Sequence, residues 1–161
     1  MVYMKANISG HIDLPDNTVD LITCLGVLHH IPNVSYIICE MGRVLKYGGY
    51  ALIREPIVSM GDWNKPRPGL TKRERGIPLP LFREFISKAN LTIFSERLTT
   101  FGPLLSICRR LRVHAYDSAL ITRLDFLLAR LFTFNYSYHS ESFVGRLRPT
   151  AVYYVLKKAS V

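Results

Sequence analysis

Residues 19–53 read VDLITCLGVLHHIPNVSYIICEMGRVLKYGGYALI. Residues 19–25 are mostly apolar and β-branched, which is typical of a strand that is buried on both faces. Asn33 is a suitable cap for the helix that follows, and Gly48-Gly49 is a suitable end for it. Residues 50–53 then resume as a strand. A strand, a helix and a strand with tight connections form a right-handed βαβ unit, so this stretch predicts a parallel sheet.

The rest of the chain continues the alternation of strands and helices on both sides of this unit. A short strand over residues 2–8 and a polar turn over 13–17 precede it. Residues 58–80 are rich in Pro, Gly, Lys and Arg, which predicts a long basic loop of the kind that covers or binds a ligand. We expect the remaining elements in this order: a helix over 80–89, a strand over 91–98, a helical insertion over 104–142 that breaks near 114–117, and a final strand over 150–157.

The composition is that of one folded domain spanning residues 1–161. Apolar residues make up 48% of the chain and charged residues 20%, so the chain can bury a core and is neither disordered nor collagen-like. No stretch is long and uncharged enough to cross a bilayer, and the N-terminus lacks the apolar core of a signal peptide. The three cysteines form no CxxC pair, so we expect no disulfide framework, no zinc or other metal site, and a cytoplasmic location.

Residues 13–56, DLPDNTVDLITCLGVLHHIPNVSYIICEMGRVLKYGGYALIREP, resemble the class I S-adenosylmethionine-dependent methyltransferases. In that family an LP…D.S.D segment enters the fourth strand of the sheet, a VLHH segment leaves it, and an E..RVLKPGG segment leads into the fifth strand. Tyr47 stands where the family usually has proline. The matching residues here are Leu14, Pro15, Asp16, Asp20, Val27, Leu28, His29, His30, Glu40, Arg43, Val44, Leu45, Lys46, Gly48 and Gly49.

The resemblance implies an α/β fold, namely a partial Rossmann-like, doubly wound sheet that corresponds to the second half of the class I methyltransferase fold. A helical, basic C-terminal extension would follow. The last two strands should form an antiparallel pair, and strand 19–25 should lie at an edge, because the family's first strand, its usual neighbour, has no match here. The family's glycine-rich cofactor loop and its acidic ribose-binding residue have no match either. We therefore expect the C-terminal part of a methyltransferase, with an incomplete cofactor site.

The activity implied for the intact enzyme is transfer of a methyl group from S-adenosylmethionine, the cofactor, to a small-molecule or carbohydrate-like acceptor. Two other classes of function stay open. A chain that folds but does not bind the cofactor would be a non-catalytic partner module. A chain that acts through its basic residues would bind an anionic surface such as a membrane.

The resemblance and the position of strand 19–25 together define the expected cofactor site. It comprises Asn7, Ile8, Cys24, Leu25 and Gly26. The last three end a parallel strand, and open α/β sheets bind ligands at that edge. Asn7 and Ile8 lie nearest to the position of the acidic residue that contacts adenine in the family. His29 is the candidate general base. The alternative for His29 is a histidine that binds backbone at the start of a helix.

The expected substrate contacts are His30, Arg54, Glu55 and Trp63. Arg54 and Glu55 follow strand 50–53 toward the same edge of the sheet, and a structural ion pair is an equally good interpretation of them. Trp63 begins the basic loop, where it would cover a substrate or only anchor the loop. Glu40 and Arg43 have the spacing of an exposed helical ion pair, which is worth a few tenths of a kcal/mol.

Two clusters of basic residues contribute to the formal charge of +9. The first, within residues 65–75, predicts either binding of an anion or a solvated loop. The second consists of Arg109, Arg110 and Arg112 and precedes an apolar helical stretch, which predicts either contact with a membrane surface or an ordinary core or lid helix. Aromatic residues are not interleaved with the basic residues of the loop, so we expect no nucleic-acid partner.

Overall fold

The computed structural model describes residue 7 and residues 9–62, 65–67, 69–71, 74–140 and 142–159. Within these residues, four strands form one sheet in the order β1-β2-β4-β3. β1 and β2 are parallel, whereas β4 is antiparallel to both of its neighbours, so the chain has a mixed α/β fold. The strands are β1 (Val19–Leu25), β2 (Leu45–Pro56), β3 (Leu91–Phe101) and β4 (Pro149–Lys158).

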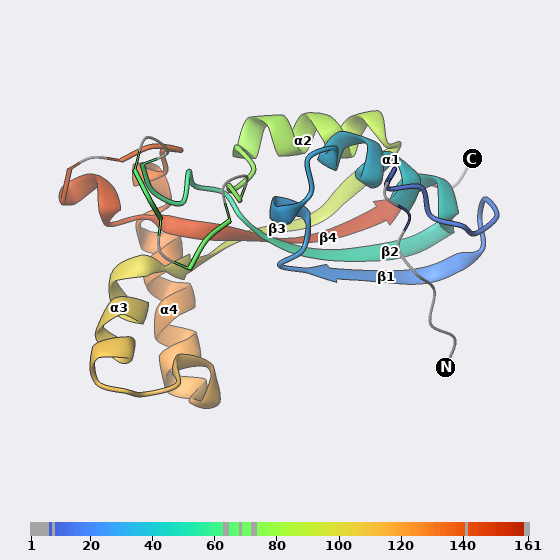
Figure 1. Ribbon diagram of the computed structural model, residues 1–161. Coiled ribbons are helices and arrows are strands. Elements are labelled where there is room, and N and C mark those ends of the chain that lie inside the picture. The colour runs from blue at the N-terminus through green and yellow to red at the C-terminus, as the bar shows by residue number, and fades with distance from the viewer. Residues whose placement is uncertain are drawn as a thin grey trace.

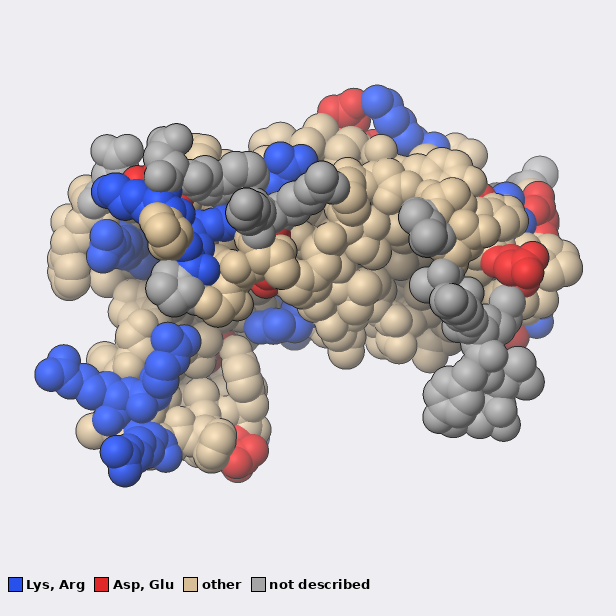
Figure 2. All heavy atoms as spheres, viewed as in Figure 1, with Lys and Arg blue, Asp and Glu red and all other residues tan. Residues whose placement is uncertain are grey.

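Two helices cover one face of the sheet, and two others project from one of its ends (Figure 1). The covering helices are α1 (Val34–Val44) and α2 (Leu79–Lys88). The projecting helices are α3 (Gly102–Arg110) and α4 (Ala119–Leu131), and Lys and Arg side chains gather over this end of the molecule (Figure 2). Short 3-10 turns join the elements: η1 (Leu28–His30), η2 (Ala115–Asp117), η3 (Thr133–Asn135) and η4 (Val144–Arg146).

The core lies between the sheet and the two covering helices. Alternate residues of β2 are buried, because successive side chains of a strand point to opposite faces. Ala51 and Ile53 of β2 are completely buried in the same cluster as Ile38 of α1 and Phe82 of α2. The Phe82 ring packs edge-on against Tyr154 of β4, with 5.1 Å between ring centroids. Glu55, near the end of β2, lies on the same buried face of the strand as Ala51 and Ile53.

Gly42 allows α1 to approach the end of α2 closely. A Cβ atom at this position would lie 2.4 Å from the carbonyl oxygen of Ala89, so a side chain here would require a backbone shift. α2 itself ends next to Asn90, which adopts a left-handed conformation with φ of 56°. The sequence predicted a helix over residues 80–89, and both ends of α2 lie within one residue of those bounds.

β1 is an edge strand of the described sheet, as predicted, and it pairs only with β2. The prediction that it is buried on both faces is wrong. Leu21 and Leu25 are 53% and 55% exposed, since among the described residues helices cover only one face of the sheet at this strand. Of the strand predicted over residues 2–8, only Asn7 is described, and Asn7 is not in a strand.

The helix of the βαβ unit ends earlier than the glycine pair predicted. α1 stops at Val44, and β2 begins at Leu45. Gly48 is left-handed, with φ of 76°, but it lies in an irregular start of β2, where the pairing with β1 shifts register. The Asn33 side chain does not cap α1, and its Nδ2 donates to the carbonyl oxygen of Ser9 at 2.6 Å.

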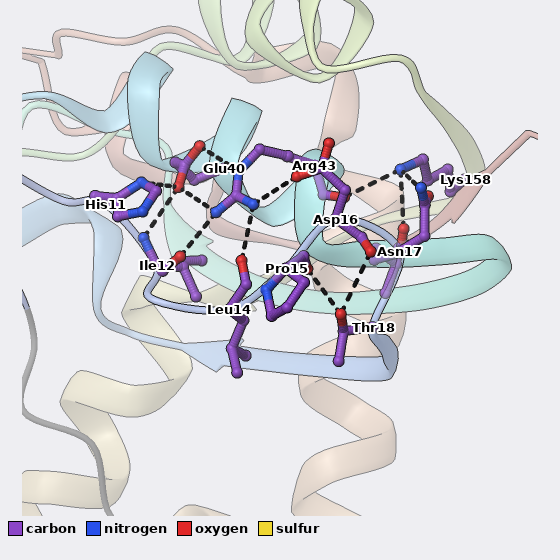
Figure 3. Close-up of polar contacts among 11 residues, drawn as sticks. His11, Ile12, Leu14, Pro15, Asp16, Asn17, Thr18, Glu40, Arg43 and Lys158 are labelled. Carbon is purple, nitrogen blue, oxygen red and sulfur yellow. Dashed lines mark hydrogen bonds and ion pairs between the residues drawn. The ribbon is translucent and has the colours of Figure 1, made fainter.

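A charged pair on α1 fixes the segment that precedes β1 (Figure 3). The Arg43 guanidinium donates to Glu40, to the Asp16 carboxylate, and to the carbonyl oxygens of Ile12 and Leu14 at 2.7 and 2.8 Å. Glu40 in turn accepts the backbone N–H of Ile12 at 3.0 Å. Glu40 is buried, so the prediction of an exposed helical ion pair is wrong. The pair holds residues 12–16 against α1 and so sets where β1 begins.

Candidate functional site

The candidate site lies at the carboxyl ends of β1 and β2. Leu25 pairs with Arg54 at the last step of the parallel ladder. The chain then turns at Gly26, whose φ of 72° suits glycine, and the Gly26 N–H donates to the Arg54 carbonyl oxygen at 2.7 Å. This turn directs the chain into η1, which carries His29 and His30.

Glu55 is the anchor of the turn. Its side chain is completely buried, and its carboxylate accepts the backbone N–H groups of Val27, Leu28 and His29 at 2.7, 2.8 and 3.3 Å. These donors would otherwise be the unpaired first N–H groups of η1. The same carboxylate lies 2.7 Å from His29 Nδ1. Because an ionised carboxylate only accepts hydrogen bonds, His29 donates from Nδ1 and its Nε2 points away from Glu55.

Glu74 faces both histidines from the loop between β2 and α2. Its carboxylate oxygens lie 3.7 Å from His29 Nε2 and 3.6 Å from His30 Nδ1. Glu74 is buried, and the Thr71 N–H donates to its Oε2 at 2.9 Å. This hydrogen bond, helped by the nearby His30 and His29, holds the pKa of Glu74 below its usual value. His29, His30 and Glu74 bring their potential ligand atoms within 4.8 Å of one another, and we call them the His–His–Glu cluster.

A cavity of about 720 Å³ opens beside His29. Its walls include residues of η1, the start of α1, the end of the β2–α2 loop, and Tyr138. The loop is closed at its base, because the Gly76 N–H donates to the Val58 carbonyl oxygen at 3.1 Å and the Tyr138 hydroxyl donates to the Gly76 carbonyl oxygen at 2.8 Å. The volume is sufficient for a small organic molecule, since ligand pockets measure ~300–1,000 Å³.

The predicted cofactor residues are placed in different surroundings. Cys24 is buried toward the core, and burial, followed by the charge of Glu55, raises the pKa of its thiol to about 11. Leu25 is exposed, and Gly26 forms the turn described above. Asn7 is exposed, and its side-chain oxygen accepts the N–H and hydroxyl of Ser9 at 3.0 and 2.9 Å. Ile8 lies outside the described residues.

The four predicted substrate residues also lie in different surroundings. His30 is exposed next to His29, with 3.9 Å between the ring centroids. Glu55 is completely buried and holds backbone, which favours the structural interpretation of this residue. Arg54 points to the opposite face of β2, where its guanidinium donates to the Thr100 hydroxyl at 3.0 Å. Trp63 lies outside the described residues.

Sequence reasoning missed Glu74 and Tyr138. Residues 65–75 were interpreted as a basic run, and Glu74 is the one acidic residue in that run, which was the available signal. Tyr138 gave no such signal, because it is one of nine tyrosines and lies 62 residues after Gly76, where it closes the loop. The buried Arg43–Glu40 pair also had a signal, since both residues match the methyltransferase motif.

The family model described as methyltransferase domain matches residues 1–53. None of the curated proteins matches the chain in sequence. Residues 1–53 include β1, η1, α1 and most of β2, and so His29 and His30, whereas Glu55 and Glu74 lie beyond the matched residues. The match confirms the resemblance to methyltransferases over residues 1–53.

The fold matches solved structures of low sequence identity. An S-adenosylmethionine-dependent methyltransferase from Mesorhizobium loti has a TM-score of 0.57 at 15% identity, over 96% of this chain and 68% of that one. A methyltransferase from Thermotoga maritima has a TM-score of 0.55 at 15% identity, over 93% and 61%. The cyclase SpnF has a TM-score of 0.55 at 17% identity, over 95% and 55%. The chain thus spans 55 to 68% of the length of these proteins, and a cyclase among them means that the fold alone does not fix the reaction.

Proposed function

We propose that the chain forms the acceptor side of an S-adenosylmethionine-dependent methyltransferase that acts on a small molecule. In this proposal its sheet is the second half of a doubly wound methyltransferase sheet. The observation that carries the proposal is the position of the 720 Å³ cavity. It is lined by η1, which follows β1, and by Ile77, whose N–H donates to the carbonyl oxygen of Pro56 at the end of β2 at 2.8 Å. Open α/β sheets bind their ligands at the carboxyl ends of their strands. The methyltransferase-domain match over residues 1–53 supports the same reaction.

The turn after β1 fits one part of the cofactor, whereas the family's glycine-rich loop and acidic ribose-binding residue have no match in this chain. Apart from Gly26 itself and its two chain neighbours, no atom of the described residues lies within 4 Å of the place where a Cβ on Gly26 would stand, so a ligand can approach the backbone there. The backbone of Leu25 and Gly26 and the wall formed by Leu28 would hold S-adenosylmethionine. When bound, this cofactor would supply a methyl group on a positively charged sulfur. The methyl group would pass to the acceptor by an in-line displacement in which S-adenosylhomocysteine is the leaving group.

His29 would accept the proton that the acceptor loses. Glu55 holds the Nδ1 hydrogen, so the Nε2 lone pair is the one available to a hydroxyl or an amine of the acceptor. Three backbone N–H groups hold Glu55 in turn, and this fixes the imidazole before the acceptor binds. Rigid positioning of this kind is the main contribution that a protein can make to a displacement reaction.

Calorimetric titration with S-adenosylhomocysteine tests the proposal. We expect saturable binding to the wild-type chain, and we expect Gly26→Val to weaken it at least 10-fold, because the side chain would occupy the open position. Gly48→Val is the matched control, since Gly48 has the same left-handed conformation and an equally open Cβ position but lies near the start of β2, at the other end of the strand. A chain that unfolds cooperatively but does not bind S-adenosylhomocysteine would overturn the proposal and would support a non-catalytic partner module.

A second candidate function is attachment to an anionic membrane surface. Leu120, Leu124, Leu127 and Leu131 of α4 recur at helical spacing and are 77, 42, 51 and 58% exposed. The opposite side of α4 is held by Asp125, which is buried and accepts the N–H groups of Thr100 and Phe101 at 3.0 and 2.7 Å. The exposed leucine stripe therefore has no covering element among the described residues.

The charge around this stripe favours anionic lipid as the partner. Arg109, Arg110 and Arg112 are exposed at and just after the end of α3, which projects from the same end of the molecule as α4, and basic side chains gather over this end (Figure 2). An apolar stripe flanked by arginines is the pattern of a helix that lies in the plane of a membrane interface. None of the described helices is long and apolar enough to cross a membrane.

Sedimentation with vesicles tests this second candidate. Vesicles of phosphatidylcholine with phosphatidylglycerol should bind the chain at low salt, and binding should fall as the salt concentration rises. Leu120→Gln combined with Leu127→Gln should reduce binding at least 10-fold without lowering the unfolding temperature. Val144→Ser, at an exposed apolar residue on η4, is the control. Equal binding by the double variant would overturn the candidate.

A further inference from the structure

We propose that the His–His–Glu cluster binds one divalent transition-metal ion, and that Zn²⁺ is its best match. The cluster unites η1 with the β2–α2 loop, and its three ligand atoms would be His29 Nε2, His30 Nδ1 and one oxygen of Glu74. The proposal stands on this geometry alone, so it is independent of the proposed methyl transfer.

The distances within the cluster suit an ion better than direct hydrogen bonds. His29 and His30 lie 3.7 and 3.6 Å from the Glu74 oxygens, beyond the 2.7 Å at which His29 binds Glu55. Zinc bonds of about 2.0–2.1 Å in tetrahedral geometry place neighbouring ligand atoms about 3.4 Å apart. The two distances go to different oxygens of Glu74, and the three ligand atoms lie within 4.8 Å of one another, so they must draw together by up to about 1.4 Å to reach this spacing.

The surroundings of the cluster orient two of its ligands. His29 donates its other ring nitrogen to Glu55, which is the arrangement that fixes the tautomer and raises the basicity of a metal-binding histidine. The Thr71 N–H holds the Glu74 carboxylate at 2.9 Å. Only 11% of the His29 side chain and 9% of the Glu74 side chain are exposed, so rotation of either ligand away from the ion would be costly.

The ligand set selects the class of ion. Two imidazoles and one carboxylate suit Zn²⁺ and other late transition metals, whereas Mg²⁺ and Ca²⁺ prefer oxygen ligands only. Three protein ligands also leave one position for water or a substrate atom, as in catalytic rather than structural zinc sites. An ion on Nε2 would hold the lone pair that the proposed function uses as a base, so zinc should inhibit methyl transfer if both proposals are correct.

Titration of zinc chloride into chelator-treated protein, followed by calorimetry, tests the site. A Cys39→Ser background removes the exposed thiol that would bind zinc elsewhere. We expect a stoichiometry near one, and we expect Glu74→Gln and His30→Asn each to weaken zinc binding at least 10-fold. Cobalt in place of zinc should produce the visible absorption of a four-coordinate site. His139→Asn, which removes a histidine of the adjacent cavity wall, should leave the affinity unchanged.

The outcomes separate this proposal from the preceding one. Two results would overturn the metal site. One is that the wild type binds zinc no more tightly than Glu74→Gln does. The other is that His139→Asn loses zinc binding while Glu74→Gln keeps it. Far-ultraviolet circular dichroism of each variant shows whether it is folded. S-adenosylhomocysteine binding, measured on the same preparations, reports on the methyltransferase proposal separately. Glu55→Gln should weaken zinc binding by about 10–100-fold, the usual effect of losing a residue that orients a ligand.

Discussion

Arg43 donates from Nε and Nη2 to the two carboxylate oxygens of Glu40, one turn earlier on α1, and both distances are 2.8 Å. The same guanidinium reaches the carbonyl oxygens of Ile12 and Leu14. The pair is therefore a clamp between a helix and the segment that leads into β1. Its loss would free the start of the strand whose far end carries the candidate site.

The clamp predicts a specific dependence of stability on pH. The hydrogen bonds from Arg43 lower the pKa of Glu40 from 4.5 to about 2. Because the folded-state pKa lies below the ordinary value, the stabilisation is complete above about pH 4.5 and is lost as the pH falls toward 2. Urea unfolding between pH 7 and pH 2.5 should show a smaller loss of stability in Glu40→Gln than in the wild type. Glu84→Gln, on the exposed side of α2, should keep the wild-type pH dependence, and equal curves for Glu40→Gln and the wild type would contradict the prediction.

Because the Glu55 carboxylate is completely buried, the conservative substitution Glu55→Gln should strongly lower the stability of the fold. Glu55→Gln keeps the shape of the side chain but replaces an ionised acceptor of three backbone N–H groups and His29. Hydrogen bonds to charged groups contribute ~1.5–3 kcal/mol each, so the free energy of unfolding should fall by about 2–4 kcal/mol. Glu84→Gln should change it by less than about 0.5 kcal/mol. Similar values for the two variants in urea unfolding would show that Glu55 does not anchor the turn.

The three free cysteines should differ in reactivity. Burial and Glu55 raise the pKa of Cys24 to about 11, and Cys108 is also buried, whereas Cys39 is exposed on α1. The thiolate is the reactive form, so one thiol should react quickly with Ellman's reagent at pH 8 and two only slowly. Cys39→Ser should abolish the fast phase, and Cys24→Ser should leave it intact. A fast phase that disappears in Cys24→Ser would mean that β1 opens readily at this edge.

Gly42→Ala should destabilise the fold although alanine favours helices. The added Cβ would lie 2.4 Å from the Ala89 carbonyl oxygen, so α1 and the end of α2 must separate. We expect the free energy of unfolding to fall by about 1–3 kcal/mol, as for other overpacked positions. Ser35→Ala, at an exposed position on the same helix, should be neutral or slightly stabilising. A stabilised Gly42→Ala variant would mean that the contact between the helices relaxes at little cost.

The βαβ unit could be predicted because its signals are local. The apolar run of residues 19–25, the helical periodicity after Asn33 and the strand at residue 50 each favour one conformation, and β1, α1 and β2 formed accordingly. The methyltransferase resemblance then added the edge position of β1 and the antiparallel pairing of the last two strands. The burial of β1 was predicted wrongly because burial depends on what covers a strand, and a strand's own sequence does not determine that.

The candidate site was only partly predictable. The sequence by itself determined that His29, His30 and Glu55 lie at the carboxyl ends of two parallel strands, since the motif and the strand pattern fix that edge. The tertiary structure alone decided that Glu55 faces inward beneath η1, that Arg54 points to the other face, and that Glu74 meets both histidines. The physical reason is that Glu74 lies in an irregular loop without a repeating pattern. Long-range contacts place that loop, among them the hydrogen bond from the Tyr138 hydroxyl to the Gly76 carbonyl oxygen, and no local signal in the sequence encodes them.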